Sequence, residues 1–309
     1  MNLKEEIRNG YTITSESKKL WQIQMEMLRK LLKVCTKYNL KIWAEGGTLL
    51  GAIRDKGFIP WDDDIDMMML RGDYEKLLKV AAEEFQFPYF FQAPSTDPGY
   101  FRGHAQLRRS DTTAILPGDV DQPFNQGVFI DIFVFDFLPA SEEERTLIFE
   151  KIEKIRNRLH RRNYELPGSV KGYLNKINES LYFIKKGFYN EYLKMEELIT
   201  KYHNPSSHLI GDVLWTSKNY HKYMRDITWY SETLNVPFED MEIPVPKEYD
   251  KVLTTQYGDY MIPAKAPSQH GTIIIDLDRP YPSVIKELRN QTYWKTKILR
   301  FLSPRPAKN

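Results

Sequence analysis

The stretch W43-A-E-G-G-T-L-L-G-A-I-R-D-K-G-F-I-P-W-D-D-D-I-D-M-M-M69 decides the fold that this sequence predicts. A glycine pair at Gly46 and Gly47 marks a turn that opens a helix. A row of carboxylates then leads into an apolar run, 67–70, which is typical of a short buried strand. Residues two apart on a strand share a face and lie about 6.5 to 7 Å apart along the chain. Asp64 and Asp66 should therefore point the same way.

The row of carboxylates at Asp62, Asp63, Asp64 and Asp66 has two interpretations. It is either a solvated acidic turn or a metal site. Charges that enter a core strand are costly to bury unless they are paired or bind a metal. Mg²⁺ takes oxygen ligands and leaves room for the phosphates of a substrate. We therefore predict a metal site at Asp64 and Asp66.

A further carboxylate, Asp131, stands inside the apolar segment V128-F-I-D-I-F-V-F135. An unpaired charge in the middle of such a strand would cost several kcal/mol to bury, so the group should be neutral, paired with a cation or bound to a metal. Because a metal site is already predicted at Asp64 and Asp66, we assign Asp131 to the same site.

Composition sets the class of protein. The chain has 309 residues, of which 28% are charged and 41% hydrophobic, which is typical of a folded protein with a sizeable core. Its single cysteine, Cys35, excludes a disulfide framework and a cysteine-based zinc site, and favours a reducing cytoplasm. The net charge of +2 says little about partners, and we predict no nucleic-acid partner.

No apolar run reaches the roughly 18 residues that a membrane-spanning helix needs, and the N-terminus lacks the apolar core of a signal peptide. We expect a cytoplasmic protein. The segment from Arg279 to Asn309 carries eight Lys/Arg and one Glu among aromatic and aliphatic residues. This basic amphipathic tail either contacts the inner face of the membrane peripherally or docks as a helix with a solvated face.

Periodicity and turn residues predict the remaining elements. Ser15 or Ser17 should cap the first helix, and Ser141 with Glu144 forms a capping box for a later one. The section 215–270 is rich in aromatic residues and proline, so it should be largely extended or looped. We predict helices at 17–39, 48–54, 73–85, 142–162 and within 168–202, strands at 41–45, 89–92, 105–107 and 128–135, and a loop at 204–207.

Several blocks of the sequence carry a resemblance. The combination of Gly46-Gly47-Thr48, Asp64-Ile65-Asp66 and a later Asp131 resembles the active-site pattern of the nucleotidyltransferase superfamily. More closely, the chain resembles the LicD family, named for phosphocholine transferases of bacterial surface glycans and related to fukutin and fukutin-related protein. The blocks that carry this resemblance are E45-G-G-T-L-L-G-A-I-R54, G57-F-I-P-W-D-D-D-I-D66, F129-I-D-I-F133, V236-P-F-E-D-M-E-I-P-V-P-K-E-Y-D-K-V-L253 and Y257-G-D-Y-M261.

The resemblance implies an α/β fold with a nucleotidyltransferase-like core, a mixed central sheet and additional helices. It covers about residues 18–139 and 214–270, whereas the middle section does not resemble the family. We therefore predict a catalytic core at 1–139 and a helical insertion at 140–213 with a role in acceptor recognition. The C-terminal part of the core follows at 214–278, and the basic tail at 279–309.

The implied reaction is transfer of a substituted phosphate from a CDP-linked donor such as CDP-choline to a sugar hydroxyl of a glycan or lipid-linked glycan, with release of CMP. The group transferred is phosphocholine in the named members and ribitol phosphate in the fukutin relatives, and phosphoethanolamine and glycerol phosphate are further alternatives. Asp64, Asp66 and Asp131 would be catalytic and would bind Mg²⁺, with Mn²⁺ as an alternative, and Asp131 is the best candidate to take the hydroxyl proton.

The resemblance also implies a set of donor-binding residues. The turn at Gly46, Gly47 and Thr48 would face the diphosphate. Arg54, with Arg108 or Arg109, would contact phosphate unless these are ordinary surface arginines. Trp61 and Tyr257 are candidates for the donor head group. His104 and His270 are general bases by residue type, but single histidines are more often structural.

Three other functions compete with this one. A glycosyltransferase of the GT-A type also uses an Asp-x-Asp motif, but a nucleotide-binding half normally precedes that motif, and here Asp64 follows one helix, one strand and one turn. Nucleotidyl transfer to a small molecule uses the same residue pattern and would release pyrophosphate instead of CMP. A glycan- or nucleotide-binding protein on a degenerate enzyme scaffold should have lost an acidic ligand, and all three are present.

Overall fold

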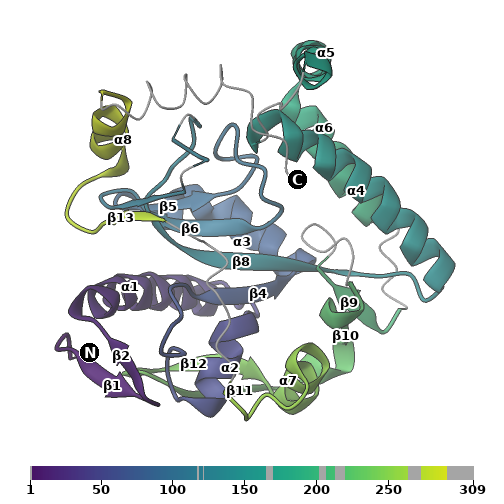
Figure 1. Cartoon of the computed structure of the whole chain (residues 1–309). Coiled ribbons are helices and arrows are strands. Elements are labelled where there is room, and N and C mark those ends of the chain that lie inside the picture. The colour runs from purple at the N-terminus through teal and green to yellow at the C-terminus, as the bar shows by residue number, and fades with distance from the viewer. Residues whose placement is uncertain are drawn as a thin grey trace, which may run out of the picture.

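A computed structural model describes residues 2–116, 118–120, 122–164, 170–201, 207–212, 220–263 and 273–290. A mixed β-sheet lies at its centre (Figure 1). Strands β10, β9, β8, β4 and β3 follow one another across the sheet, and β6 and β5 branch from β8. The pair β4 and β8 is parallel, and the other pairs are antiparallel. The predicted α/β fold with a mixed central sheet is confirmed. The strands are β3 (Trp43–Ala44), β4 (Asp66–Leu70), β5 (Tyr89–Gln92), β6 (Ala105–Arg109), β8 (Val128–Phe137), β9 (Leu209–Gly211) and β10 (Met224–Asp226).

The apolar run after the acidic row forms the buried strand that its sequence predicts. Met67, Met68 and Met69 of β4 are fully buried, so both faces of this strand are covered. Such coverage is typical of a parallel strand in the interior of a sheet. Asp64 precedes the strand rather than lying on it, because β4 begins at Asp66. The strand expected at 41–45 is shorter, at Trp43–Ala44.

Three helices of the N-terminal half pack around this sheet: α1 (Ser15–Lys37), α2 (Gly46–Arg54) and α3 (Arg71–Glu84). Neither serine predicted to cap α1 is its N-cap. Thr14, one residue before Ser15, has this position, and its side chain accepts a hydrogen bond from the Ser17 amide. The prediction for α2 placed its start at Thr48, but the helix begins at the glycine pair. A hairpin of β1 (Glu6–Arg8) and β2 (Tyr11–Ile13) precedes α1.

The described residues between 140 and 212 are mainly helical, as predicted: α4 (Glu142–Tyr164), α5 (Val170–Lys186) and α6 (Phe188–Lys201) pack around a hydrophobic cluster of their own. The Glu144 amide donates to the Ser141 hydroxyl at 3.4 Å, which supports the predicted cap of α4. Figure 1 shows these helices on one side of the sheet. Residues 202–206, which include most of the loop predicted at 204–207, lie outside the described residues.

A buried ion pair fixes this helical layer to the sheet. Arg71, at the start of α3, donates from Nε and Nη2 to the two carboxylate oxygens of Asp136 on β8, at 2.9 and 2.8 Å. Its Nη1 reaches Glu196 of α6 at 3.3 Å. Burial alone would lower the pKa of Arg71, but the two carboxylates raise it above its usual value. Such two-pronged pairing is the favourable geometry for a buried guanidinium.

The C-terminal part of the chain returns to the core in short elements, as its prolines predicted. The hairpin of β11 (Thr233–Phe238) and β12 (Met241–Pro246) packs near β3 and is followed by α7 (Tyr249–Tyr257). Several short strands were not predicted: β1, β2, β9 and the antiparallel pair of β7 (Thr113–Ile115) and β13 (Ile274–Asp276). Two 3₁₀ turns, Tyr220–Tyr223 and Ile227–Tyr230, flank β10.

The start of the predicted basic tail forms α8 (Tyr281–Asn290), which packs on β7 through Val284 and Ile285. Residues 291–309 lie outside the described residues, so the predicted membrane contact of the tail stays a prediction. Among the described residues, no helix combines the length and the apolarity needed to cross a bilayer.

Cys35 should be unreactive in the folded protein. Burial, reinforced by the negative charge of Asp73, raises the pKa of its thiol to about 12. Only the thiolate attacks thiol reagents, and a free cysteine has a pKa of about 8.5. We expect a disulfide reagent at pH 8 to label the native protein about a thousandfold more slowly than a free thiol, whereas the unfolded chain is labelled at once. Rapid stoichiometric labelling of the native protein would contradict this burial.

Candidate active site

Three carboxylates meet at the sheet. Asp66 opens β4 and Asp131 lies on β8, and the parallel register places these two residues opposite each other. The Asp131 amide donates to the Ile65 carbonyl at 2.8 Å, which fixes the relative height of the two strands. Asp64 lies two residues before Asp66. Side-chain oxygens of Asp64, Asp66 and Asp131 lie within 4.8 Å of one another, so the three residues that the sequence assigned to one site are brought together.

The electrostatics of this cluster are strongly unfavourable for three charged carboxylates. Asp64 and Asp66 keep some contact with solvent, but burial by the surrounding protein removes much of the hydration of their carboxylates. This burial is the largest cause that raises the pKa of both side chains well above the usual value. After burial, the main cause for Asp64 is Asp66, and for Asp66 it is Asp131. Like charges this close must bind protons or a cation, since they cannot all be ionised without one.

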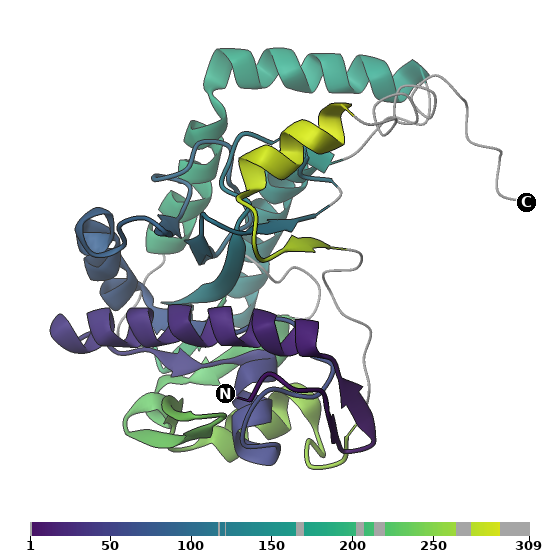
Figure 2. The ribbon, with the colours of Figure 1, turned by 90° about the vertical axis from the view of Figure 1, so that its left-hand side faces the viewer.

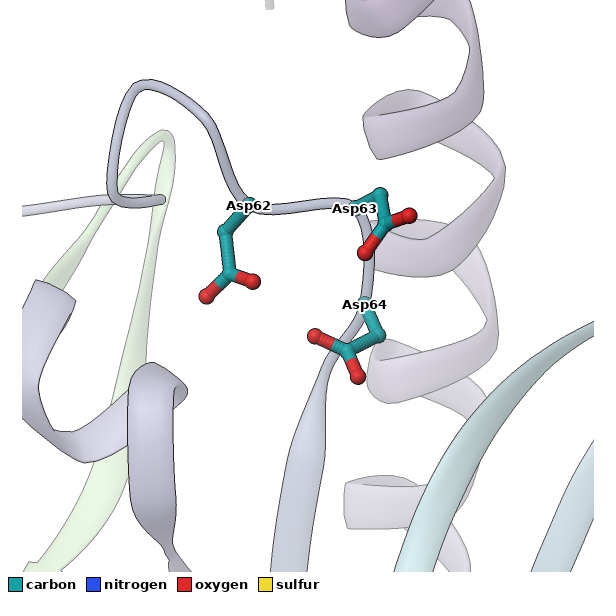
Figure 3. A group of neighbouring side chains, drawn as sticks. All are labelled: Asp62, Asp63 and Asp64. Carbon is teal, nitrogen blue, oxygen red and sulfur yellow. The ribbon is translucent and has the colours of Figure 1, made fainter. Parts of the chain in front are cut away.

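The acidic loop before β4 is held by α1. The carbonyl of Asp62 accepts a hydrogen bond from the Trp21 indole at 3.0 Å, and the carbonyl of Asp63 accepts one from the Gln24 amide at 2.8 Å. Figure 3 shows the side chains of Asp62 and Asp64 turned toward a common space. Oxygens of Asp62, Asp63 and Asp64 also lie within 4.8 Å of one another. The loop therefore offers a second group of carboxylates that shares Asp64 with the first.

The glycine pair lets α2 approach these carboxylates. Gly46 has a φ of +55°, and a Cβ there would lie 2.9 Å from Oδ2 of Asp66. A Cβ at Gly47 would lie 2.6 Å from Oδ2 of Asp62. Carboxylates at a helix N-terminus are favoured by its free amides and its dipole. The predicted glycine turn thus borders the site.

Thr48, which we predicted to face the donor diphosphate, makes a structural contact with the site. Its buried hydroxyl accepts a hydrogen bond from the Asp66 amide at 2.8 Å, and the Asp66 carbonyl accepts one from the Glu45 amide at 3.0 Å. These two bonds fix the backbone of Asp66 against the start of α2. Thr48 therefore positions a carboxylate.

Replacing Gly46 by Ala should disturb both the fold and the site. A left-handed φ costs about 1–2 kcal/mol for a residue with a Cβ, and the added methyl group would displace the Asp66 carboxylate. We expect a lower melting temperature and at least about tenfold less turnover. Gly72→Ala on α3 is the matched control, because a Cβ there meets nothing within 4 Å. Equal behaviour of the two variants would contradict the proposed role of Gly46.

Asp131 is held by side chains from the neighbouring strand region. The Gln106 amide on β6 donates to Oδ1 of Asp131, and Nε2 of His104 lies 3.2 Å from the same oxygen. Both partners are buried. The alternation of β6 predicts that Gln106 faces Asp131, because these residues are directly paired across the two strands. His104, a weak candidate by sequence, therefore lies beside the site.

The arginines predicted to bind phosphate are occupied by protein groups. Arg108 is the clearest correction: it is buried, and it donates to the side-chain oxygen of Gln92 and to the Gly127 carbonyl, both at 2.7 Å. Burial lowers its pKa to about 10. Arg109 pairs with Asp111 and Glu26.

Arg54 is likewise engaged. It pairs with the adjacent Asp55 at 2.9 Å and donates to the Tyr260 carbonyl at 3.2 Å. Charge alone could not distinguish these structural arginines from phosphate ligands, because the distinction depends on which acceptors the fold places around them.

The two predicted aromatic residues differ in position. Tyr257, at the end of α7, is exposed, but the surrounding protein and then the negative charges of Glu45 and Asp66 raise the pKa of its hydroxyl. Tyr257 therefore lies near the carboxylate cluster. Trp61 packs edge-to-face on Tyr11 of β2, with ring centroids 5.9 Å apart.

Sequence reasoning missed a buried ion pair next to the cluster. Glu45, the N-cap of α2, pairs with Arg225 of β10 at 3.4 Å, and both side chains are buried. Burial raises the pKa of Glu45, and Arg225 acts in the opposite direction. Arg225 also donates to Gln256 of α7 at 2.9 Å. These residues are distant in sequence, so no local pattern could have paired them.

The fold and the site together define a mixed α/β protein in which a glycine-opened helix and a three-carboxylate cluster meet at two parallel strands. The family model described as LicD/FKTN/FKRP, nucleotidyltransferase domain, matches residues 39–163, which include β3, α2, β4 and β8. Residues 39–163 of the chain therefore match the nucleotidyltransferase domain of the LicD family.

The chain is also similar to curated proteins. The chain is 28% identical over 237 residues to the lipopolysaccharide cholinephosphotransferase LicD of Haemophilus influenzae, a match that covers 74% of this chain and 84% of the relative. Shorter matches of 64 residues, 38% and 44% identical, link it to uncharacterized proteins of Rickettsia prowazekii and Rickettsia typhi. These cover 21% of this chain, and 24% and 21% of the two relatives.

Proposed function

We propose that this protein transfers a substituted phosphate, phosphocholine in the first instance, from a CDP-linked donor to a sugar hydroxyl of a cell-surface polysaccharide or its lipid-linked precursor. The observation that carries the proposal is the convergence of Asp64, Asp66 and Asp131, whose oxygens lie within 4.8 Å of one another. The name of the relative from Haemophilus influenzae supports the choice of phosphocholine and of a glycan acceptor.

The residues present fit a hard divalent cation. The cluster supplies carboxylate oxygens, which Mg²⁺ and Mn²⁺ prefer, and the raised pKa values of Asp64 and Asp66 mark a site with uncompensated negative charge. Asp64, Asp66 and Asp131 would hold the ion. A bound Mg²⁺ neutralises charge on the donor phosphates and on the oxygens that attack and leave.

In the proposed mechanism, residues of this chain position the reacting groups and accept the proton of the sugar hydroxyl. In the proposed reaction the sugar oxygen forms a bond to the phosphorus that carries choline, the bond from that phosphorus to the bridging oxygen breaks, and CMP leaves with the bond electrons. The hydroxyl proton passes to Asp131, whose Oδ1 is oriented by Gln106 and His104. Positioning and charge neutralisation do most of the catalytic work in phosphoryl transfer.

The surroundings of the cluster suit a cationic head group. Tyr257 lies near Glu45 and Asp66, as the effect of these two carboxylates on its pKa indicates. A quaternary ammonium group binds aromatic faces through cation–π contacts, and negative charge nearby strengthens its attraction. We therefore place the choline end of the donor near Tyr257.

The test is a survey of donors. Purified protein with Mg²⁺ or Mn²⁺ is incubated separately with CDP-choline, CDP-ethanolamine, CDP-glycerol, CDP-ribitol, CTP and ATP, and release of CMP or pyrophosphate is followed together with the heat of binding. CMP formation from one CDP-linked donor, fastest with CDP-choline, is the expected result. Pyrophosphate formation from CTP or ATP, without CMP from any CDP-linked donor, would instead assign nucleotidyl transfer.

A further inference from the structure

Helix α5 exposes a row of aliphatic side chains that no described residue covers. Val170, Leu174, Ile177 and Leu181 are 79%, 57%, 55% and 58% exposed. Their spacing of four, three and four residues places them on one face of the helix. Single exposed aliphatic residues are ordinary, but a continuous apolar stripe marks an interaction surface.

The opposite side of α5 holds it on the protein. Phe183 is buried in the hydrophobic cluster of the three helices, and the Tyr182 hydroxyl donates to Glu191 of α6 at 2.8 Å. Phe183 lies about half a helical turn away from the exposed stripe. One face of α5 therefore packs against α4 and α6, and a second apolar face is directed away from them. Figures 1 and 2 both show α5 at the outer edge of the molecule, beyond α6 and away from the central sheet.

The charge of this helix indicates what the stripe contacts. The sequence of α5 contains four lysines and one glutamate, and the preceding α4 ends in the basic segment R156-N-R-L-H-R-R162. Lys171 is exposed beside the stripe. An apolar face on a helix rich in lysine is the pattern of helices that lie in the interface of an anionic bilayer, where the aliphatic groups enter the acyl boundary and the lysines meet lipid phosphates.

We propose that the Val170–Leu181 face of α5 docks on an anionic lipid surface. A second copy of this chain fits the observations less well. A symmetric contact through the same face would bring the lysines of both copies together, and one stripe of four aliphatic side chains is small beside the roughly 800 Å² per partner of a stable interface. The proposal goes beyond the transfer reaction, although membrane docking would bring the enzyme to a lipid-linked acceptor.

The test is flotation of the full-length protein with vesicles of phosphatidylglycerol and phosphatidylcholine, compared with vesicles of phosphatidylcholine alone. We expect binding to the anionic vesicles, and at least about tenfold weaker partitioning for the double variant Leu174→Gln/Ile177→Gln. Glutamine keeps the helix propensity and the approximate size of these side chains.

Matched controls separate this docking from other causes. Leu147→Gln removes an aliphatic side chain of α4 that is 47% exposed, and should leave partitioning within about twofold of wild type. Asp66→Asn should float like the wild type, so docking is measured independently of the proposed chemistry. Circular dichroism and the melting temperature show whether each variant is folded.

Three results would overturn the proposal. The wild-type protein could fail to float with anionic vesicles. The double variant could float as well as the wild type, which would assign binding to another segment, such as the basic tail. Sedimentation velocity could instead show a dimer that the double variant dissociates, which would assign the face to a second copy.

Discussion

Asp66→Asn should reduce product formation by about a thousandfold or more while the protein stays folded. The Asp66 carboxylate stands opposite Asp131 and is close to Asp64, so its loss removes the central member of the cluster. The metal-free variant should be at least as stable as the wild type, because the substitution removes one of several repelling charges that raise the pKa of Asp64. CMP release and thermal melting measure the two effects.

The proposed metal binding would supply an independent readout of the same site. Mg²⁺ at one hundred times its Kd should add about 2.7 kcal/mol to the stability of the wild type, which raises its melting temperature by several degrees, and should add much less to Asp66→Asn. Asp64→Asn and Asp131→Asn should behave in the same way. Asp63→Asn, in the same loop but outside this group of three, should keep turnover within about tenfold of wild type. Near-normal turnover in two of the three cluster variants would contradict the site.

The carboxylate cluster could be predicted because its signal is local. Charged side chains at the start of one apolar strand and in the middle of another are anomalies in sequence, and each anomaly has few physical solutions. The parallel pairing of β4 and β8 then brings Asp66 and Asp131 together. The glycine pair also gives a local signal, because two adjacent glycines mark a turn. The sequence did not show that the pair forms the first turn of α2, where the Asp62 and Asp66 carboxylates approach it closely.

The features that sequence reasoning missed depend on contacts between distant segments. Strand β7 has only three residues and exists as a strand through its pairing with β13, far along the chain. An arginine is a suitable phosphate ligand by residue type, but the fold buries Arg108, which donates hydrogen bonds to the Gln92 side chain and the Gly127 carbonyl. No single-sequence pattern reports such partners, because propensity describes local conformation and the partners are set by packing.

Arg225→Met should be the most destabilising single substitution near the site. The guanidinium is fully buried, and its removal leaves the Glu45 carboxylate buried and unpaired next to Asp66. Breaking a buried ion pair from one side costs about 3–5 kcal/mol, so the melting temperature should fall by on the order of 10 °C. CMP release should fall as well, because Glu45 caps α2 and its amide donates to the Asp66 carbonyl.

The double variant Arg225→Met/Glu45→Gln tests the cause of this loss. If the cost is the uncompensated charge, glutamine at position 45 removes it, and the double variant should recover most of the lost stability. Glu45→Gln alone should cost less than Arg225→Met, because glutamine keeps a side-chain oxygen and Arg225 still donates to Gln256 and to the carbonyls of Lys222 and Met224. Additive losses in the double variant would show that packing, and not the pairing of these two charges, holds β10 against the start of α2.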